Sequence, residues 1–426
     1  MEAALREAPP LVSGSCRGKT MSILKPLDAK QIAEMIAWVA ADGDSLEIVA
    51  GGTKRALGRP MKTDHVLDLS GLAGIVEYEA AELVMTARPG EPLVSINAEL
   101  AKKRQMLAFE PPDWRGLLGA EGEPTLGGVI ACNLAGSRRV RAGSARDYVL
   151  GFSAVNGFGE IWKAGGKVVK NVTGYDMCKL QAGAYGTLSA LTEVTIKVMP
   201  KPETACTIVL HGVADEVAIP LLADALNSPF EVSGAAHLPA SVARRSRVGA
   251  AAAGLGPATA LRLEGPRPSV AYRAEALEAL VGRGLRLNEA ETAAFWAEVG
   301  AVQPLLAQGP RIVWRICPTP SHAAALARSL LSTLASAEFY FDWGGGLIWL
   351  SLDPGEAGPD AGAGIIRPEV QSASGHATLI RASEAVRAAT PVFEPLSPAL
   401  AELTARVKKG FDPSGVLNPG RMQEGL

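Results

Sequence analysis

The sequence has few cysteines, and none of them forms a paired motif. Five cysteines are dispersed over 426 residues without a C-x-x-C pair. Iron–sulfur clusters and structural zinc sites need closely spaced thiolates, so we expect neither within this chain. The odd number and wide spacing of the cysteines favour a reducing compartment over a disulfide-bonded, secreted protein.

The chain also lacks a charge surplus, aromatic clusters and long apolar runs. Its net charge is -2 and only 5% of its residues are aromatic, which argues against a nucleic-acid-binding protein. No apolar run reaches the roughly 18 residues of a membrane span. The first twenty residues lack the apolar core of a signal peptide. We expect a disordered extension over residues 1–21, with translation starting at Met1 or Met21.

Histidines are scarce and scattered. The five histidines contain no H-x-H or H-x-x-x-H pattern, so the sequence predicts no metal site. They are His65, His211, His237, His322 and His376.

Glycine, in contrast, is abundant and concentrated in two stretches about 75 residues apart. Residues 48–54 and 124–133 each join apolar, strand-like residues to a bare backbone turn. Glycine lets a ligand approach the main chain, and successive N–H groups in such a turn form a concave anion site. Two such sites suggest a diphosphate held by backbone. The common G-x-G-x-x-G and G-x-x-x-x-G-K-[ST] motifs are absent.

The first part of the chain alternates short strands with helices. A helix over 29–41 is predicted by a capping box at Asp28 and by apolar residues at helical spacing. Pro200-Lys-Pro202 marks a boundary. The elements expected before it are a second helix at 92–103 and strands at 47–50, 65–69, 74–78, 83–87, 148–156, 160–163 and 188–198.

After this boundary the pattern indicates an antiparallel sheet with helices on one face. The Ala/Gly-rich stretches 249–257 and 354–364 are expected to be exposed loops. The elements expected are strands at 207–211, 230–237, 258–264, 311–316, 347–352 and 377–380, and helices at 214–227, 269–281 (capped by Ser269) and 321–335.

A last helix is predicted near the end of the sequence. Ser397 caps it, Pro398 takes its first position and Gly410 ends it. Leu400, Leu403 and Val407 would form its buried stripe. The proline turns that follow would dock onto the body of the protein.

From about Ser22 onward, the chain resembles the vanillyl-alcohol-oxidase-like flavoproteins. The resemblance implies an α+β fold: a PCMH-type FAD-binding domain of two α+β subdomains at 22–200, a cap domain at 201–395, and a helix and tail at 396–426 that return to the first domain. Five segments match in order: 49–54, 124–133, 143–147, 173–188 and 412–420.

The resemblance implies FAD as the cofactor and also implies which residues contact it. Gly51–Lys54 would hold one phosphate and Leu126–Gly128 would approach the other, with Asn133 and Ser137 as polar partners. Asn418 would reach the cofactor from the cap side. The full set is Ala50, Gly51, Gly52, Thr53, Lys54, Pro124, Thr125, Leu126, Gly127, Gly128, Asn133, Ser137, Gly143, Ser144, Ala145, Gly186, Thr187 and Asn418.

Within that family the chain is similar to FAD-binding subunits of bacterial glycolate oxidases. This implies a second FAD subunit and an iron–sulfur subunit as partners, a small 2-hydroxy acid as substrate, and oxidation of glycolate to glyoxylate. It also implies a cytoplasmic location, with the inner membrane reached only through partners. Two alternatives stay open: a self-sufficient FAD-dependent oxidoreductase of a small hydroxy acid or alcohol, and a non-catalytic structural subunit.

Candidate catalytic residues are few. Oxidation of a 2-hydroxy acid by flavin needs a cation for the carboxylate and a base for the hydroxyl proton. Arg262, Arg315 and Arg381 are candidates for the cation and His376 for the base. Tyr340, Trp343 and Trp349 would wall a ring pocket or fill the core. The basic cluster Arg138, Arg139, Arg141 and Arg146 would form a solvated loop, neutralise a diphosphate, or dock an acidic partner.

Overall fold

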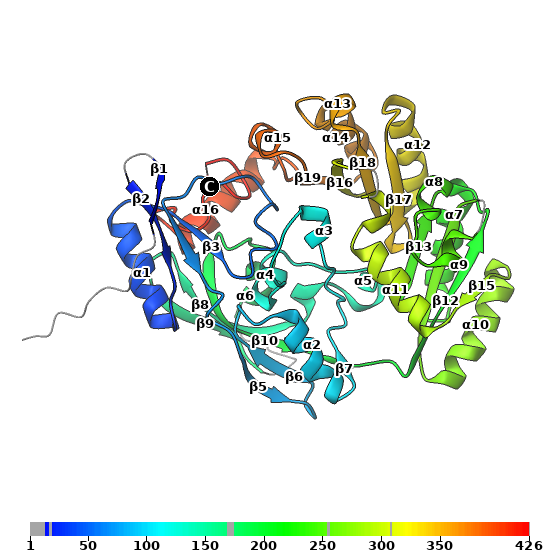
Figure 1. Ribbon diagram of the computed structural model, residues 1–426, viewed down its shortest axis with the longest axis horizontal. Coiled ribbons are helices and arrows are strands. Elements are labelled where there is room, and N and C mark those ends of the chain that lie inside the picture. The colour runs from blue at the N-terminus through cyan, green and yellow to red at the C-terminus, as the bar shows by residue number, and fades with distance from the viewer. Residues whose placement is uncertain (1–12, 17–18, 168–173, 254–255, 307–308, 426) are drawn as a thin grey trace, which may run out of the picture.

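The computed structural model describes residues 13–16, 19–167, 174–253, 256–306 and 309–425 (Figure 1). Strand β1 (Ser13–Cys16) pairs antiparallel with β2 (Lys19–Leu24). The expectation of a disordered extension over residues 1–21 is therefore wrong where these two strands lie, because they pair with each other and β2 joins a sheet. Residues 1–12 and 17–18 lie outside the described residues.

The first sheet has the strand order β1-β2-β4-β3 and is covered by helix α1 (Ala29–Ala41). Strands β3 (Leu46–Val49) and β4 (His65–Asp68) run parallel to each other. The predicted cap of α1 is present, since the Asp28 side chain accepts from the backbone N–H of Gln31 at 2.8 Å. Ile32, Ile36 and Val39 then bury the apolar face of the helix.

A second, antiparallel sheet follows with the order β5-β6-β10-β8-β9. Its strands are β5 (Ile75–Glu79), β6 (Val84–Ala87), β8 (Val149–Asn156), β9 (Ile161–Gly165) and β10 (Ser189–Lys197). Around it lie α2 (Leu93–Lys102), α3 (Arg115–Leu118), α4 (Leu126–Ala131), α5 (Arg139–Ala142), the turn η1 (Ala145–Asp147), α6 (Met177–Gln181), and the short pair β7 (Gln105–Met106) and β11 (Met199–Pro200). The second glycine stretch is thus helical in α4, and its apolar residues were wrongly taken as strand-like.

The third sheet has eight strands, every neighbouring pair antiparallel, in the order β15-β12-β14-β13-β17-β18-β16-β19. This confirms the predicted antiparallel sheet. The strands are β12 (Thr204–His211), β13 (Gly234–Leu238), β14 (Ala258–Gly265), β15 (Leu285–Leu287), β16 (Ile312–Cys317), β17 (Glu338–Asp342), β18 (Leu347–Leu352) and β19 (His376–Arg381). Strand β13 starts later than predicted, because Glu231 has a left-handed backbone (φ 53) that ends any extended run.

Four long helices cover one face of this sheet: α7 (Asp215–Asn227), α10 (Arg267–Val281), α12 (Ala323–Thr333) and α14 (Ala363–Ser372). The first three were predicted, and α14 was missed. Sequence reasoning missed α11 (Glu289–Gly300), which packs with short α8 (Ala240–Ala243) on the other face. The expected loops also hold helical turns, namely α9 (Gly249–Ala252), α13 (Pro354–Ala357) and the start of α14. Pro266, not Ser269, precedes α10, and the Ser269 hydroxyl instead accepts from Arg273.

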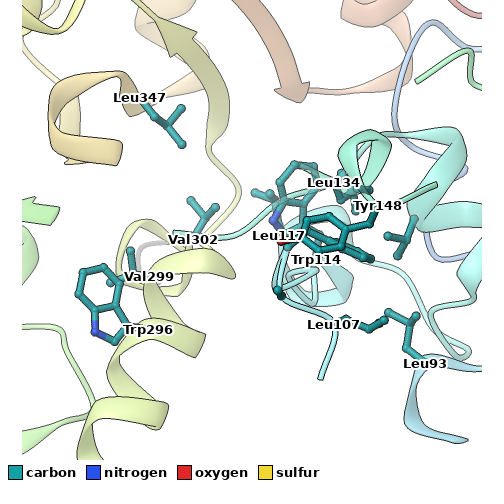
Figure 2. Packing of buried hydrophobic residues seen from close by; sticks show 14 of the residues in the cluster. Leu93, Leu107, Trp114, Leu117, Leu134, Tyr148, Trp296, Val299, Val302 and Leu347 are labelled. Atoms are coloured by element: carbon teal, nitrogen blue, oxygen red, sulfur yellow. The ribbon is translucent and has the colours of Figure 1, made fainter. Parts of the chain in front are cut away.

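The α11 face of the third sheet shares one hydrophobic core with the second sheet. In Figure 2, Trp296, Val299 and Val302 approach this core from one side, and Trp114, Leu134 and Tyr148 from the other. The Trp114 indole donates to the Gly300 carbonyl at 3.0 Å and meets Trp349 edge-on at 5.6 Å. Tyr340 is fully buried and donates to the Val299 carbonyl, so Tyr340 and Trp349 are core residues.

The chain then returns to the first sheet through α15 (Glu384–Ala389) and α16 (Pro398–Phe411). The tail after α16 lies beside β3, where Leu46 N–H donates to Val416 and Asn418 N–H donates to Leu46 (Figure 1). The predicted buried stripe of α16 is wrong: Leu400 and Leu403 are exposed, and Lys408 is the buried residue of the helix. Its ammonium donates to Thr187 O, Leu417 O and the Asp412 carboxylate at 2.6–2.9 Å, so polar contacts orient the helix.

Candidate functional site

A cleft of about 810 Å³ lies where β3 ends, against α4, the start of β10 and the tail. Ten residues predicted to contact a cofactor line this cleft. They are Ala50, Gly51, Gly52, Thr53, Lys54, Thr125, Gly127, Gly128, Gly186 and Asn418.

The turn after β3 presents a row of unused backbone donors to this cleft. In the part of the chain that the structure describes, no hydrogen bond is made by the N–H groups of Gly51–Lys54. Gly52 has φ +70, and a Cβ on Gly51 would lie 1.8 Å from the Glu123 carbonyl oxygen, so both positions require glycine. Consecutive free N–H groups in such a turn suit an anion.

Two cations stand beside these donors, Lys54 partly buried and Arg421 buried. Burial lowers the pKa of Lys54, whose ammonium donates to the Thr53 hydroxyl at 3.0 Å. Burial also lowers the pKa of Arg421, whose guanidinium donates to the Lys54 carbonyl at 2.7 Å. Sequence reasoning missed Arg421, because it directly follows the recognised tail motif and its burial depends on the docking of the tail.

Helix α4 lets a ligand come close to its backbone, but the N–H groups at its start are already used in hydrogen bonds. Thr125 caps the helix, while the N–H groups of Leu126 and Gly127 donate to Glu91 and Pro89 carbonyls at 3.0 and 2.9 Å. A Cβ on Gly127 would lie 2.6 Å from Pro89, so glycine at this position lets α4 pack closely against the segment that contains Pro89. Gly128 then faces the cleft next to Lys54.

Asn418 fastens two sides of the cleft together. Its Oδ1 accepts from Ile48 N–H at 2.8 Å, and its Nδ2 donates to the Tyr185 carbonyl at 2.6 Å. The side chain therefore positions the walls of the cleft.

Gln181 is the clearest unmet polar group in the cleft. Its Oε1 accepts from Ser189, but its buried Nε2 has no hydrogen-bond partner. Buried polar groups are normally paired, so this nitrogen is a donor available to a ligand.

Several predicted contact residues lie elsewhere. Ser137 is fully buried and donates to the Asp342 carboxylate at 2.6 Å, so it is not available as a polar partner of a cofactor. Ser144 and Asp147 form a capping box after Gly143, which positions the turn that carries Arg146; the N–H of Arg146 donates to Asn133. Neither cavity described here is lined by Pro124, Leu126, Ser137, Gly143, Ser144 or Ala145.

A second, larger cavity of about 2360 Å³ adjoins the cleft, and Cys132 and Tyr185 line both. It lies between the loop segments 132–139 and 183–188, the β16–β19 edge of the third sheet and α16. Among its lining residues are Asn133, Thr187, Arg139, Arg315, Trp343 and His376.

The three candidate arginines have different surroundings. Arg315 lines the second cavity. Arg262 is buried in an ion pair with Glu110 at 2.7 Å and stacks on Trp296, so its charge is already matched. Arg381, at the end of β19, lines neither cavity.

The four arginines of the basic cluster also differ in their surroundings. Arg138 pairs with Glu264, Arg141 with Glu231 and Arg146 with Asp147. Only Arg139 of the four lines the second cavity. None of the four lines the cleft, so the positive charges there are those of Lys54, Arg55 and Arg421.

His376 lies opposite Cys317 in the β16–β19 pairing, and both line the second cavity. The interaction with Cys317 raises the pKa of His376. Burial raises the pKa of the Cys317 thiol, but Arg315, His376 and Arg139 outweigh it, so that pKa lies below its usual range.

The described residues hold neither a cluster of metal ligands nor a membrane-spanning helix. No three His, Cys, Asp or Glu side chains come together there as metal ligands. In the same ranges, no helix is both long and apolar enough to cross a bilayer.

Comparison with known proteins agrees with this geometry. Residues 22–165 match the model of an FAD binding domain. The glycolate oxidase subunit GlcE of Escherichia coli (strain K12) is 34% identical over 401 residues, which covers 94% of this chain and 99% of that protein. The glycolate oxidase subunit GlcD of Bacillus subtilis (strain 168) is 31% identical over 188 residues, 44% of this chain and 38% of that protein.

A likeness among solved structures shows the fold. The p-cresol methylhydroxylase structure with substrate bound has a TM-score of 0.69 at 12% identity and covers 95% of this chain and 89% of that chain. With a GlcE relative matched over almost its whole length, this chain belongs to the family of the glycolate oxidase subunit GlcE, FAD-dependent oxidoreductases with a PCMH-type FAD-binding fold.

Proposed function

We propose that this chain is the FAD-binding subunit of a glycolate oxidase complex that converts glycolate to glyoxylate. A second flavoprotein subunit and an iron–sulfur subunit would accompany it, and the iron–sulfur subunit would receive the electrons. The match to GlcE over 99% of that protein supports the assignment. The observation that carries it is the continuity of the donor-lined cleft with the larger cavity at Cys132 and Tyr185.

The cleft has the groups that FAD needs. The free N–H groups of Gly51–Lys54, with the charges of Lys54 and Arg421, would hold the diphosphate. Gln181 Nε2 supplies a further buried donor. When bound, FAD accepts the hydride that leaves a substrate carbon.

The larger cavity would hold the substrate. Oxidation of glycolate removes a hydride from the carbon and a proton from the hydroxyl group. His376 is the lining residue suited to take that proton, because an imidazole titrates near neutral pH and its side chain is exposed in the cavity.

The proposed division of labour follows the sheets. Residues 22–200 would bind FAD and residues 201–395 would cap the substrate. Residues 396–426 would close the cleft, since Asn418 and Arg421 come from this segment.

The test begins with the purified full-length chain. We expect visible flavin absorbance and FAD release on denaturation. Absence of flavin after growth with ample FAD would favour the structural-subunit alternative. Co-purification of a tagged chain should recover a second flavoprotein and an iron–sulfur protein, and the recovered complex should reduce an artificial electron acceptor when glycolate is added.

Other outcomes separate the remaining alternatives. Glycolate oxidation by the isolated chain, with turnover equal to that of the complex, would support a self-sufficient enzyme. A complex that holds FAD but ignores glycolate would contradict the proposed substrate.

A further inference from the structure

Two guanidinium groups from different parts of the fold meet at one aromatic ring. Arg139, from α5, lies 4.9 Å from the centroid of Trp343, and Arg315, from β16, lies 5.0 Å from the same centroid. Trp343 follows β17 and is held in place by its indole N–H, which donates to the Gly136 carbonyl at 3.1 Å. All three side chains line the second cavity.

Neither of these arginines has a counter-ion in the described structure. In the described residues, the side chains of Arg139 and Arg315 make no hydrogen bond or ion pair, in contrast to those of Arg138, Arg141 and Arg262 nearby. Burial and the neighbouring Arg315 lower the pKa of Arg139, so each charge is a cost to the other. Partly buried like charges of this kind are stabilised by an anion placed between them.

The carboxylates around the two arginines are already engaged. Glu394 lines the cavity, but its Oε2 accepts from Arg367 at 2.8 Å and from Ala377 N–H at 3.0 Å. Asp147, near Arg139, accepts from the N–H and hydroxyl of Ser144. The remaining neighbours, Cys317 and His376, are a thiol and an imidazole. Neither is a permanent anion that could balance two guanidinium charges.

We propose that Arg139 and Arg315, with Trp343 between them, form a binding site for the carboxylate of a small 2-hydroxy acid. Guanidinium groups match the planar fork of a carboxylate, and the tryptophan ring keeps both groups oriented. The inference rests on the proposed function, because it assigns the substrate site to the cavity that adjoins the FAD cleft. It implies that this chain binds substrate itself and does not only relay electrons.

The site takes one arginine from the FAD-binding part and one from the third sheet. A bound carboxylate would therefore link α5 to β16. Substrate binding and the relative position of the two parts of the fold are coupled through these two side chains.

The experiment is a titration of the FAD-loaded, full-length chain with glycolate and with oxalate, a two-carbon acid that has no hydroxyl to oxidise. Binding is followed by perturbation of the flavin absorbance. We expect Arg139→Gln and Arg315→Gln each to weaken oxalate binding by about tenfold to a hundredfold, as loss of a charge-assisted hydrogen bond predicts. Arg381→Gln is the matched control, since Arg381 lies on the adjacent strand and outside the cavity. FAD content should stay at the wild-type level in all three, and Tm should not fall in any of them, since each cavity variant removes a like-charge repulsion.

Unchanged oxalate affinity in both cavity variants would overturn the proposal. A shifted flavin midpoint potential with unchanged affinity would also overturn it, because the arginines would then serve the flavin ring. Restored affinity in Arg315→Lys, which keeps the charge, would support it. If oxalate binding depends on both arginines while neither the chain nor its complex oxidises glycolate, the site stands and the proposed substrate fails.

Discussion

Gly186 and Asn418 fit so tightly that a Cβ at position 186 would lie 2.6 Å from Asn418 Nδ2. Gly186 also has φ +72, a conformation that disfavours alanine. We expect Gly186→Ala to lower the free energy of unfolding by about 1–3 kcal/mol and to reduce FAD retention. Gly415→Ala is the control, because Gly415 has a similar φ of +66 with no atom within 4 Å of a built Cβ. Thermal melts and flavin content measure both effects, and equal losses in the two variants would show that contact with Asn418 is unimportant.

Asn418 should position the cleft through its side chain. Its backbone has φ +43, so Asn418→Gly tolerates the conformation while removing the contacts to Ile48 and Tyr185. We expect a loss of about 1–3 kcal/mol in unfolding free energy and weaker FAD binding, because two buried backbone groups lose their partner. Isothermal titration of the apo-protein with FAD is the measurement. Wild-type affinity in Asn418→Gly would contradict a positioning role.

Arg421 should contribute to FAD affinity through its charge. Arg421→Gln is expected to raise the Kd for FAD by about tenfold to a hundredfold and to weaken its dependence on salt concentration. Arg55→Gln is the comparison, since Arg55 also lines the cleft but is half exposed and hydrogen-bonded to Glu47, which the Arg421 guanidinium approaches only to 3.9 Å. A titration monitored by flavin fluorescence distinguishes them. An equal or larger effect of Arg55→Gln would place the important charge on Arg55.

Asp342 should make stability depend on pH. Burial raises its pKa to about 7, against hydrogen bonds from Ser137 and Trp343 N–H that favour the ionised form. The folded chain then keeps this proton up to about pH 7, whereas the unfolded chain releases it near the ordinary value of 3.8. Unfolding thus releases a proton in this window, so stability falls as pH rises from about 4 to about 7 and then levels off. Asp342→Asn should flatten that fall, by up to a few kcal/mol. Denaturant unfolding of both proteins across this range is the check, and parallel pH profiles would refute it.

The orientation of α16 gives a further test. Lys408→Met removes a buried ammonium and leaves the Asp412 carboxylate without its cation, so we expect a loss of about 3–5 kcal/mol. Leu403→Ser should change stability by less than about 0.5 kcal/mol, because Leu403 is 47% exposed. Urea unfolding compares the two. A larger loss from Leu403→Ser would restore the leucine stripe as the buried face.

The fold was largely predictable where local patterns agree with tertiary packing. The cap of α1 at Asp28 and the alternating residues of β10 both appear as predicted. Helix α11 was missed because it buries the polar residues Thr292 and Glu298 together with aromatic ones, which blurs any apolar stripe. The α16 stripe was misread because Lys408 is buried by its hydrogen bonds to Thr187, 221 residues away, and to the docked tail at Asp412 and Leu417, and apolar spacing carries no sign of these contacts.

In the candidate site too, features set by the local backbone were predictable, and features set by distant contacts were not. Glycine at 51, 52 and 186 marks places where the backbone itself must be bare, so the cleft could be located from sequence. Ser137 was assigned wrongly, because its partner Asp342 lies 205 residues away. The importance of Arg421 follows from its contact with the Lys54 carbonyl, and that of Arg139 from its position at Trp343 without a counter-ion in the described residues. Neither can be read from the sequence.

The joining of Ile48 to Asn418 spans 370 residues and has a consequence for biosynthesis. A ribosome finishes the glycine turn at Gly51–Lys54 early but adds Asn418 and Arg421 only after about 365 further residues. Until then the backbone donors of the turn face a cleft that lacks the contacts of Asn418 with Ile48 and Tyr185. We therefore expect the cofactor to be retained only late in translation or after it, so that a nascent chain arrested before residue 418 does not hold FAD.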